Sequence, residues 1–279
     1  MTGTWGPFSL LAVSLMATPP WHRLDAPERE VRIAALSKLP FVERLVEASS
    51  GFLNVPYLES PLGEGEGVDP DPPLRFDAVD CLTFVEQSIA LAVSKDSPQM
   101  EAALRRLRYR GEANYLQRNH LMEAQWLPHN VASGFLRDVT QEYGGGFDVE
   151  ASKTLSGESW RSPSSKALKL PADHQPQGVY PFRYVPLAKA ARRLREVPTG
   201  TLVVVVREER AFKATRMTHL GIVLQQAGKA YIRHASKSRH KRVVDERADE
   251  FVARHARYDK WRVVGVSLFA ILEPQEAGL

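Results

Sequence analysis

Residues 76 to 92 read FDAVDCLTFVEQSIALA, and this stretch decides the first half of the fold. Its apolar residues recur at the spacing of one helix face, which predicts an amphipathic helix. Asp80 stands where an N-cap residue belongs, so Cys81 falls in the first helical turn. The apolar positions on this face are Leu82, Val85, Ile89, Ala92 and Val93.

The chain contains a single cysteine, and its predicted position favours a reactive role. Backbone N–H groups in the first turn of a helix have no partner within the helix, and the helix macrodipole is positive there. Both effects favour a thiolate, so we expect the pKa of Cys81 to lie below the value of about 8.5 for a free cysteine. The alternative is a small buried core residue, which is the commoner role of a free cysteine.

Composition describes an ordinary globular chain and excludes several classes of protein. The 279 residues, of which 43% are apolar and 25% charged, suffice for one large domain or two small ones. One cysteine excludes a disulfide framework and a cysteine-rich metal site. The net charge of +4 is too small to indicate a nucleic-acid partner, and no nucleic-acid-binding motif is present. A mildly basic protein would suit an acidic polymer.

The N-terminus, MTGTWGPFSLLAVSLMATPP, has the apolar core of a signal peptide. The run from Phe8 to Ala17 has the right length for such a core and is too short to span a bilayer. No Lys or Arg precedes the run, so the charged start of a signal peptide is missing. We expect residues 1 to 20 to be a signal peptide and the protein to be exported to the periplasm. The alternatives are a mis-assigned start or a disordered tail.

Helices are predicted in the first part of the chain. Apolar stripes predict two helical pieces around Pro40 between residues 25 and 50, and a basic amphipathic helix from residue 100 to 108. Residues 148 to 182 are polar and show no clear period, so we expect an irregular surface excursion there. Residues 184 to 196 predict a short basic helix.

Strands are predicted from Thr201 onward. The β-branched run TLVVVVR predicts a buried strand, and THLGIVLQ and KAYIRHAS follow on either side of a turn at residues 226 to 228. RVVGVSLFAIL, from Arg262, predicts a final strand. Helices followed by an antiparallel sheet give an α+β fold, and residues 25 to 275 are expected to form a single domain.

Folding the hairpin about its turn brings two histidines to one place. A four-residue loop would set His219 opposite His234, whereas a tighter loop would set His219 opposite Ser236. A cysteine at a helix start, a histidine on a strand and a third group that orients the histidine form the arrangement of a nucleophile and its base. The alternatives are two unrelated histidines, or a zinc site made of the histidines with a carboxylate or Cys81. No HExxH or Cys-x-x-Cys spacing supports zinc.

These residues resemble the NlpC-type papain-like cysteine hydrolases of bacterial cell walls. VDCLTFVE is similar to the start of that family's cysteine helix, THLGIVLQ and IRHAS are similar to its two histidine strands, and NVPY is similar to its tyrosine segment. Within the superfamily, RLRYRGE, QWLPHN and YGGG resemble motifs of the N-acetylmuramoyl-L-alanine amidase-like branch. The similarity runs from about Ile33 to Leu272, with residues 148 to 182 poorly matched.

The resemblance implies roles for individual residues. Cys81 would be the nucleophile, His219 the base and His234 the third catalytic residue, while Asp80 and Tyr57 would bind substrate near the scissile amide. Three features depart from the family pattern: Asn54-Val55 before the tyrosine, Leu82 after the cysteine, and the basic run RHASKSRHKR.

The sequence therefore predicts an exported amidase that acts on peptidoglycan fragments without a cofactor or metal. The resemblance implies cleavage between N-acetylmuramic acid and L-alanine. Trp126 would offer a stacking face for a sugar, unless it is a core residue, and Ser236 is a further candidate for substrate contact. The same catalytic residues would also serve a stem-peptide endopeptidase, and a binding module that has lost catalysis is a third reading.

Overall fold

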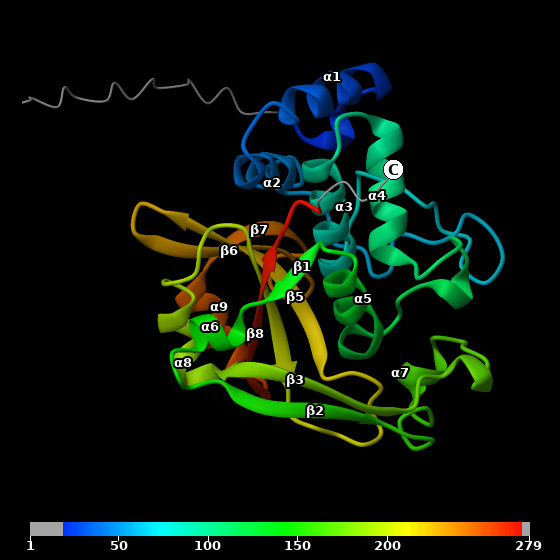
Figure 1. Cartoon of the computed structure of the whole chain (residues 1–279), viewed down its shortest axis with the longest axis vertical. Helices are drawn as coiled ribbons and strands as arrows, with labels where there is room; N and C mark the ends of the chain where they lie inside the picture. The colour runs from blue at the N-terminus through cyan, green and yellow to red at the C-terminus, as the bar shows by residue number, and fades with distance from the viewer. Residues whose placement is uncertain (1–18, 275–279) are drawn as a thin grey trace, which may run out of the picture.

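The computed structural model describes residues 19–274, in which helices pack on both faces of an eight-stranded sheet (Figure 1). The predicted α+β class is confirmed. The α-helices are α1 Ala26–Leu36, α2 Phe41–Ser50, α3 Cys81–Val93, α4 Ser97–Arg108, α5 Leu127–Ala132, α6 Thr140–Gly144, α7 Pro163–Lys166, α8 Leu187–Arg193 and α9 Ala248–His255. The strands are β1 Leu136–Asp138, β2 Val149–Leu155, β3 Gly178–Pro186, β4 Thr201–Arg207, β5 Met217–Gln226, β6 Lys229–Ser236, β7 Arg242–Arg247 and β8 Val263–Ile271.

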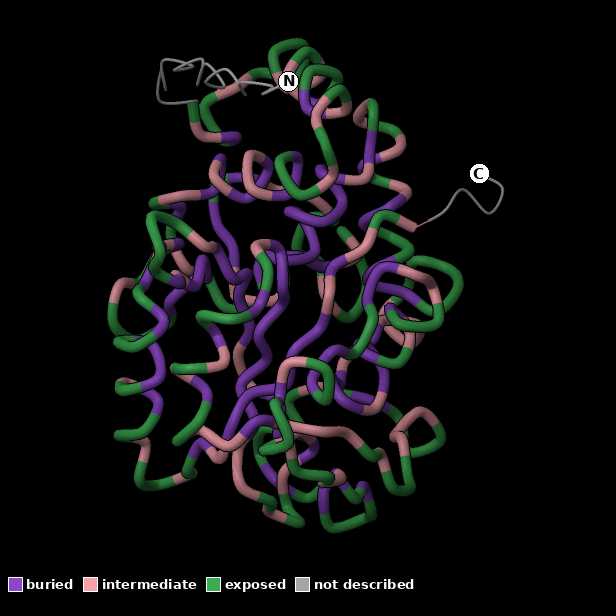
Figure 2. Tube along the Cα trace, turned by 60° about the vertical axis from the view of Figure 1, so that its left-hand side comes forward, coloured by how far each residue is buried: buried purple, intermediate pink, exposed green. Residues whose placement is uncertain are grey.

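The sheet has the strand order β2-β3-β8-β4-β5-β6-β7, with β1 paired to β8. All of these pairings are antiparallel. The strand β4, predicted from TLVVVVR, lies at the centre, and none of its first six residues is more than slightly exposed. Figure 2 shows these central strands as the buried interior of the molecule.

Alternate residues of the central strands pack into two separate hydrophobic cores, one on each face of the sheet. On one face, Leu220 and Ile222 of β5 join a cluster with Phe84 and Ile89 of α3. On the other face, residues of β4 and β6 join a cluster with Phe251 of α9. Because side chains alternate across a strand, a one-residue change in register would exchange these two faces.

The expected irregular excursion at residues 148 to 182 is wrong. Strand β2 pairs along its whole length with β3, from Val149 opposite Tyr184 to Leu155 opposite Gly178. They form the outer edge of the sheet, where both faces are partly exposed, so the alternation of polar and apolar residues that marks a half-buried strand is weak. Residues 184 to 186 belong to β3, and the expected helix begins at Leu187.

A third, small core attaches the tip of this edge hairpin to the rest of the molecule. Trp160 is 6% exposed, and its indole N–H donates to the Pro176 carbonyl at 3.2 Å. The cluster consists of Leu121, Leu155, Trp160, Leu170 and Ala214. The segment that connects β2 and β3 is thus anchored by apolar contacts.

Two expectations concern membranes and the N-terminus. None of the helices in the described part of the chain has the length and apolar character that crossing a bilayer requires. The expected signal peptide lies almost entirely in residues 1–18, outside the described residues.

Candidate active site

The start of α3 places Cys81 by an N-terminal cap. The Asp80 carboxylate accepts hydrogen bonds from the Thr83 backbone N–H at 2.7 Å, and the Thr83 hydroxyl accepts one from the Asp80 N–H at 2.9 Å. This reciprocal pair is a capping box, and it fixes the first helical turn. Cys81 is the first residue of the helix and is half-buried, as the sequence predicts.

The surroundings of the thiol differ from the expectation. Burial raises the pKa of Cys81 to about 12, and the Asp80 carboxylate adds to the rise. The backbone N–H groups of Leu220, Cys81 and Leu82 lower this pKa, but they do not offset the burial. The expected pKa below the free value is therefore wrong for this structure, because the same aspartate that caps the helix sets a negative charge beside the sulfur.

The hairpin β5–β6 has the tighter of the two loops considered. Ala227 and Gly228 form its turn, both with positive φ, at 48° and 73°. The paired residues end at Ile222 opposite Arg233. Beyond this pair the two strands no longer share a ladder, and the Leu220 N–H faces the sulfur of Cys81.

The two histidines meet in spite of this register. If the register of the paired residues is continued along both strands, Ser236, and not His234, lies opposite His219. Nevertheless His219 Nε2 and His234 Nδ1 lie 2.8 Å apart, because diagonal neighbours on adjacent strands are within reach of long side chains. Ser236 is 2% exposed, and its hydroxyl oxygen accepts from the His240 N–H at 3.4 Å. Ser236 is thus buried here, and its contact with substrate stays a prediction.

A carboxylate and an arginine continue this chain of contacts, and sequence reasoning missed both. His234 Nε2 lies 3.0 Å from Glu246 Oε2 on β7. Arg254 on α9 donates to both carboxylate oxygens of Glu246, at 3.0 and 2.7 Å. Val243-Val244, two β-branched residues just before Glu246, were the available signal for the strand β7, but they say nothing about which face meets His234.

Both histidines are held in the neutral form. Burial lowers the pKa of His219 well below its usual value, and the neighbouring His234, His255 and Arg254 add to this lowering. Burial also lowers the pKa of His234, while its hydrogen bond to Glu246 opposes the change. No hydrogen bond joins the Cys81 sulfur to His219 among the described residues. Catalytic contacts in ligand-free enzymes are often long and tighten when substrate binds.

Tyr57 lies close to Cys81 and Asp80. Burial raises the pKa of its phenol far above the usual value, and the neighbouring Cys81 and Asp80 add to the rise. The backbone of this segment pairs with the residue before the N-cap, because Leu58 N–H donates to the Val79 carbonyl at 3.1 Å.

The predicted role of Trp126 as a stacking face for a sugar is wrong. Its side chain is fully buried, and its indole N–H donates to Glu86 Oε1 in α3 at 2.8 Å. A buried ring offers no face to a sugar, so Trp126 belongs to the core. Its partner Glu86 also faces Arg108, and burial raises the pKa of the Glu86 carboxyl to about 7.

A cavity of about 320 Å³ adjoins the start of α3. Asp80 and Leu82 form one wall, and segments before α3, after α4 and after α7 form the others. Asn119 also lines it, is 3% exposed, and has no hydrogen-bond partner for either side-chain amide atom in residues 19–274. Burial lowers the pKa of the neighbouring His120 to about 4, so that imidazole is neutral too. Other lining residues are Ser60, Val68, Arg118 and Leu168.

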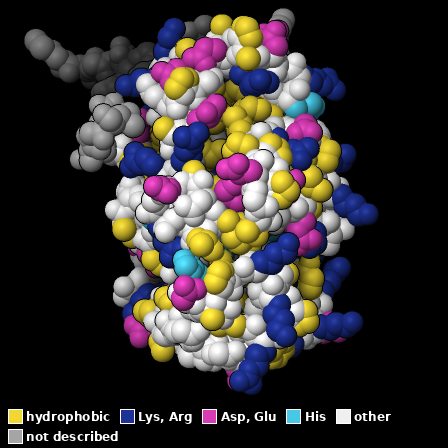
Figure 3. All heavy atoms as spheres, turned by 90° about the vertical axis from the view of Figure 1, so that its right-hand side faces the viewer, with side chains coloured by type: hydrophobic (Ala, Val, Ile, Leu, Met, Phe, Trp, Pro, Cys, Tyr) yellow, Lys and Arg dark blue, Asp and Glu magenta, His cyan; other side chains and the backbone are white. Residues whose placement is uncertain are grey.

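The charged side chains of this cavity are mostly paired with one another. Arg118 donates to Glu64 at 2.5 Å and to Asp69 at 2.8 Å. Figure 3 shows acidic and basic side chains interspersed with hydrophobic ones on one face of the molecule. Within residues 19–274, no group of three or more His, Cys, Asp and Glu side chains is arranged to hold a metal ion.

Residues 47–257 match the sequence model of a family described as N-acetylmuramoyl-L-alanine amidase-like. No curated protein sequence matches the chain.

Solved structures share the fold. A Legionella pneumophila protein of family DUF1460 superposes with a TM-score of 0.77 at 21% identity, covering 88% of this chain and 94% of its own. An N-acetylmuramoyl-L-alanine amidase from Bacteroides uniformis superposes with a TM-score of 0.66 at 22% identity, covering 83% of this chain and 99% of its own. At these identities the likeness shows the fold alone.

Proposed function

Because this chain belongs to the N-acetylmuramoyl-L-alanine amidase-like family, we propose that it hydrolyses the amide between N-acetylmuramic acid and L-alanine in peptidoglycan fragments. The observation that carries this proposal is the start of α3, where Cys81 lies against the strand that bears His219. We propose an NlpC-type papain-like arrangement, with Cys81 as nucleophile and His219 as base. His234 would orient His219 through their 2.8 Å contact.

The first half of the reaction forms a thioester. Cys81 and His219 are both neutral at rest, so the imidazole takes the thiol proton as the sulfur attacks the amide carbonyl. Negative charge develops on the carbonyl oxygen, and backbone N–H groups at the start of α3 are placed to stabilise it. The tetrahedral intermediate then expels the amine of L-alanine, which receives its proton from His219.

The second half of the reaction hydrolyses the thioester and releases the carboxylic acid. Water loses a proton to His219 and attacks the thioester carbonyl, and the sulfur leaves as a thiol after the proton returns to it. The products are a stem peptide with a free L-alanine amino group and a muramic acid with a free lactyl carboxylate. No cofactor takes part in these steps.

The cavity beside Asp80 is the proposed binding place for one side of the substrate. It adjoins the nucleophile, and Asn119 presents a buried amide whose donor and acceptor both lack partners in the described chain. Buried polar groups are usually hydrogen-bonded, so a ligand group that both donates and accepts would complete this site. Tyr57 and Asp80 would contact the substrate closer to the scissile bond.

We also propose that the protein acts outside the cytoplasm. The support is the apolar run Phe8 to Ala17 and the chemistry of the substrate, which belongs to the cell wall. The mass of the mature N-terminus after fractionation of producing cells tests this. An intact Met1 in a cytoplasmic fraction would contradict it.

Analysis of the products tests which amide bond the protein cleaves. Purified protein is incubated with a disaccharide-tetrapeptide, and the product masses are recorded, with Cys81→Ala as the control. We expect an intact tetrapeptide and a free disaccharide. Cleavage between D-glutamate and the diamino acid would show an endopeptidase, and binding without cleavage would show a module that has lost catalysis.

A further inference from the structure

Among the described residues, Glu246 is the one carboxylate that is hydrogen-bonded to either of the two histidines, and its partner is His234. Its side chain is 2% exposed, and one of its oxygens lies 3.0 Å from His234 Nε2. Arg254 binds both carboxylate oxygens, and Arg239 donates to Oε1 at 3.4 Å. A buried carboxylate held by two guanidinium groups remains ionised, and an ionised carboxylate can only accept hydrogen bonds.

This acceptor dictates where the protons lie. Because Glu246 only accepts, His234 Nε2 must carry a proton and donate it. A neutral imidazole has one N–H, so His234 Nδ1 is unprotonated and accepts. His219 Nε2, 2.8 Å away, must then be the donor. A neutral His219 therefore has its free lone pair on Nδ1, the one nitrogen that does not face His234.

We propose that Glu246 is a positioning residue that fixes the tautomers of His234 and His219, and so leaves His219 Nδ1 free to take the thiol proton. The carboxylate acts through His234 and touches neither substrate nor sulfur. The proposal rests on the proposed cysteine chemistry for its kinetic consequences. Its statement about the two tautomers stands independently of any activity.

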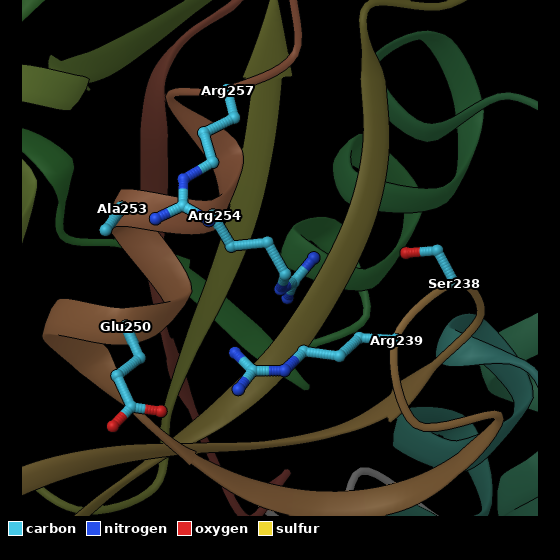
Figure 4. A pocket seen from close by; sticks show the side chains of 6 residues that line it. All are labelled: Ser238, Arg239, Glu250, Ala253, Arg254 and Arg257. Atoms are coloured by element: carbon cyan, nitrogen blue, oxygen red, sulfur yellow. The ribbon is translucent and has the colours of Figure 1, made fainter.

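The two arginines that bind Glu246 also line a groove at the surface. Arg239, Arg254 and Arg257 line a groove of about 470 Å³ on the outer side of Glu246, with Glu250 at its rim (Figure 4). Figure 4 shows the Arg254 and Arg239 side chains reaching into the groove from α9 and from the turn between β6 and β7. The basic run that departs from the family pattern thus supplies a cation to Glu246.

Other titratable groups face the two imidazoles. His255 of α9 stacks on His219 with ring centroids 5.9 Å apart, and burial lowers its pKa to about 3. His240 lies close enough to His234 to lower its pKa. Positive charge on His240 or Arg254 disfavours the imidazolium forms, whereas Glu246 favours His234 as an N–H donor.

The direct test is imidazole ¹⁵N NMR of the full chain, with assignment by the variants His219→Gln and His234→Gln. We expect both His219 and His234 to be in the Nε2–H tautomer near neutral pH. In Glu246→Gln, the amide can donate to His234, so we expect a mixture of tautomers at both rings. A wild-type His219 in the Nδ1–H tautomer, or tautomers unchanged by Glu246→Gln, would overturn the proposal.

Kinetics provide the second test. We expect Glu246→Gln to lower kcat by about 10²- to 10³-fold with little change in KM, somewhat less than the ~10⁴-fold loss seen when an amide replaces a carboxylate that touches the base directly. The matched control is Glu250→Gln, which neutralises an exposed carboxylate in the same groove and should keep wild-type kcat. A wild-type kcat for Glu246→Gln would contradict the proposal.

A double-mutant cycle separates positioning from general damage. In a His234→Gln background the route from Glu246 to His219 is already cut, so adding Glu246→Gln should lower kcat no further. Fully additive losses would show that Glu246 supports only the fold. If wild-type protein hydrolyses no muropeptide, the proposed function fails, and the NMR result still decides the tautomers.

Discussion

At the position of Cys81, two influences on the thiol oppose each other. The helix start favours a thiolate, while burial and the Asp80 carboxylate favour the protonated form, and the second influence is the larger. His219 is also held neutral. The pair therefore rests as thiol and imidazole, and substrate binding must precede or accompany the proton transfer.

The pH dependence of alkylation follows from this resting state. Since only the thiolate reacts, and the pKa of Cys81 is about 12, we expect the rate of iodoacetamide labelling to rise about tenfold per pH unit between about pH 6 and pH 9. Mass spectrometry at fixed times measures the rate, with glutathione as the reference thiol. A rate that is already constant above about pH 6 would show the thiolate that the helix start alone predicts.

Removal of the proposed nucleophile Cys81 or of the proposed base His219 should have the same effect on turnover. We expect Cys81→Ala and His219→Ala each to lower kcat by roughly 10⁴-fold or more, and the double variant to be no worse, because the two residues act as one unit. His129→Ala is the matched control, since this half-buried imidazole lies outside the site and its recorded hydrogen bond is to the Arg106 carbonyl. Additive losses would remove His219 from the role of base.

The site was predictable where a local pattern fixes the geometry. Helical spacing and an N-cap placed Cys81, whereas the hairpin pattern placed His219 beside a second polar group and left His234 and Ser236 as alternatives. Glu246 escaped prediction because its contact depends on how β7 pairs with β6, which no turn residue in this sequence reveals. Trp126 was misplaced because a tryptophan near a cleft and a tryptophan in the core look alike until its partner Glu86 is known.

The hairpin β5–β6 shows how an element brings side chains together against its own register. At Gly221 the neighbouring strand leaves no room for a side chain. A Cβ there would lie 2.7 Å from Ile232 Cγ2 and 2.9 Å from both the Arg233 carbonyl oxygen and His234 Cβ. The missing side chain lets His234 come close enough to reach the diagonal His219.

Substitution of this glycine should therefore damage the element and the site together. We expect Gly221→Ala to lower the free energy of unfolding by about 1 to 3 kcal/mol, since backbone and a packed β-branched side chain must shift. It should also lower kcat, because His234 moves. Urea unfolding and muropeptide turnover measure the two effects.

The control for this variant is Gly157→Ala, where an added Cβ meets nothing within 4 Å. It should change neither quantity. If Gly221→Ala matched this control in both stability and turnover, close approach at Gly221 would not be what aligns the histidines.

Across the whole molecule, the central sheet was predictable and its edges were not. Runs such as TLVVVVR predict buried strands because both faces of β4 are covered. Strands β2 and β3 were missed because they lie at the edge, where exposure weakens the pattern, and their pairing closes a loop of more than twenty residues. A buried lysine helps to hold this edge: Lys153 is fully buried and donates to Glu209 at 2.6 Å.

The contact between β7 and α9 also links the site to the stability of the whole fold. Glu246 of β7 makes this contact. The hydrogen bonds of its carboxylate to His234 and Arg254 lower the pKa of Glu246 from about 4.5 to about 2, although burial opposes them. A carboxyl whose pKa is lower in the folded state stabilises the fold above the unfolded pKa, and this stabilisation is lost as the pH falls from about 4.5 toward 2.

We therefore expect Glu246→Gln to be less stable than the wild type at neutral pH by about 2 kcal/mol, below the usual ~3–5 kcal/mol for breaking a buried pair because Arg254 reaches solvent. The difference should shrink as the pH falls through the window from about 4.5 to 2. Urea unfolding at several pH values measures it, and Glu250→Gln should parallel the wild type throughout. A difference that stays constant with pH would mean that Glu246 stabilises the fold by packing and not by charge.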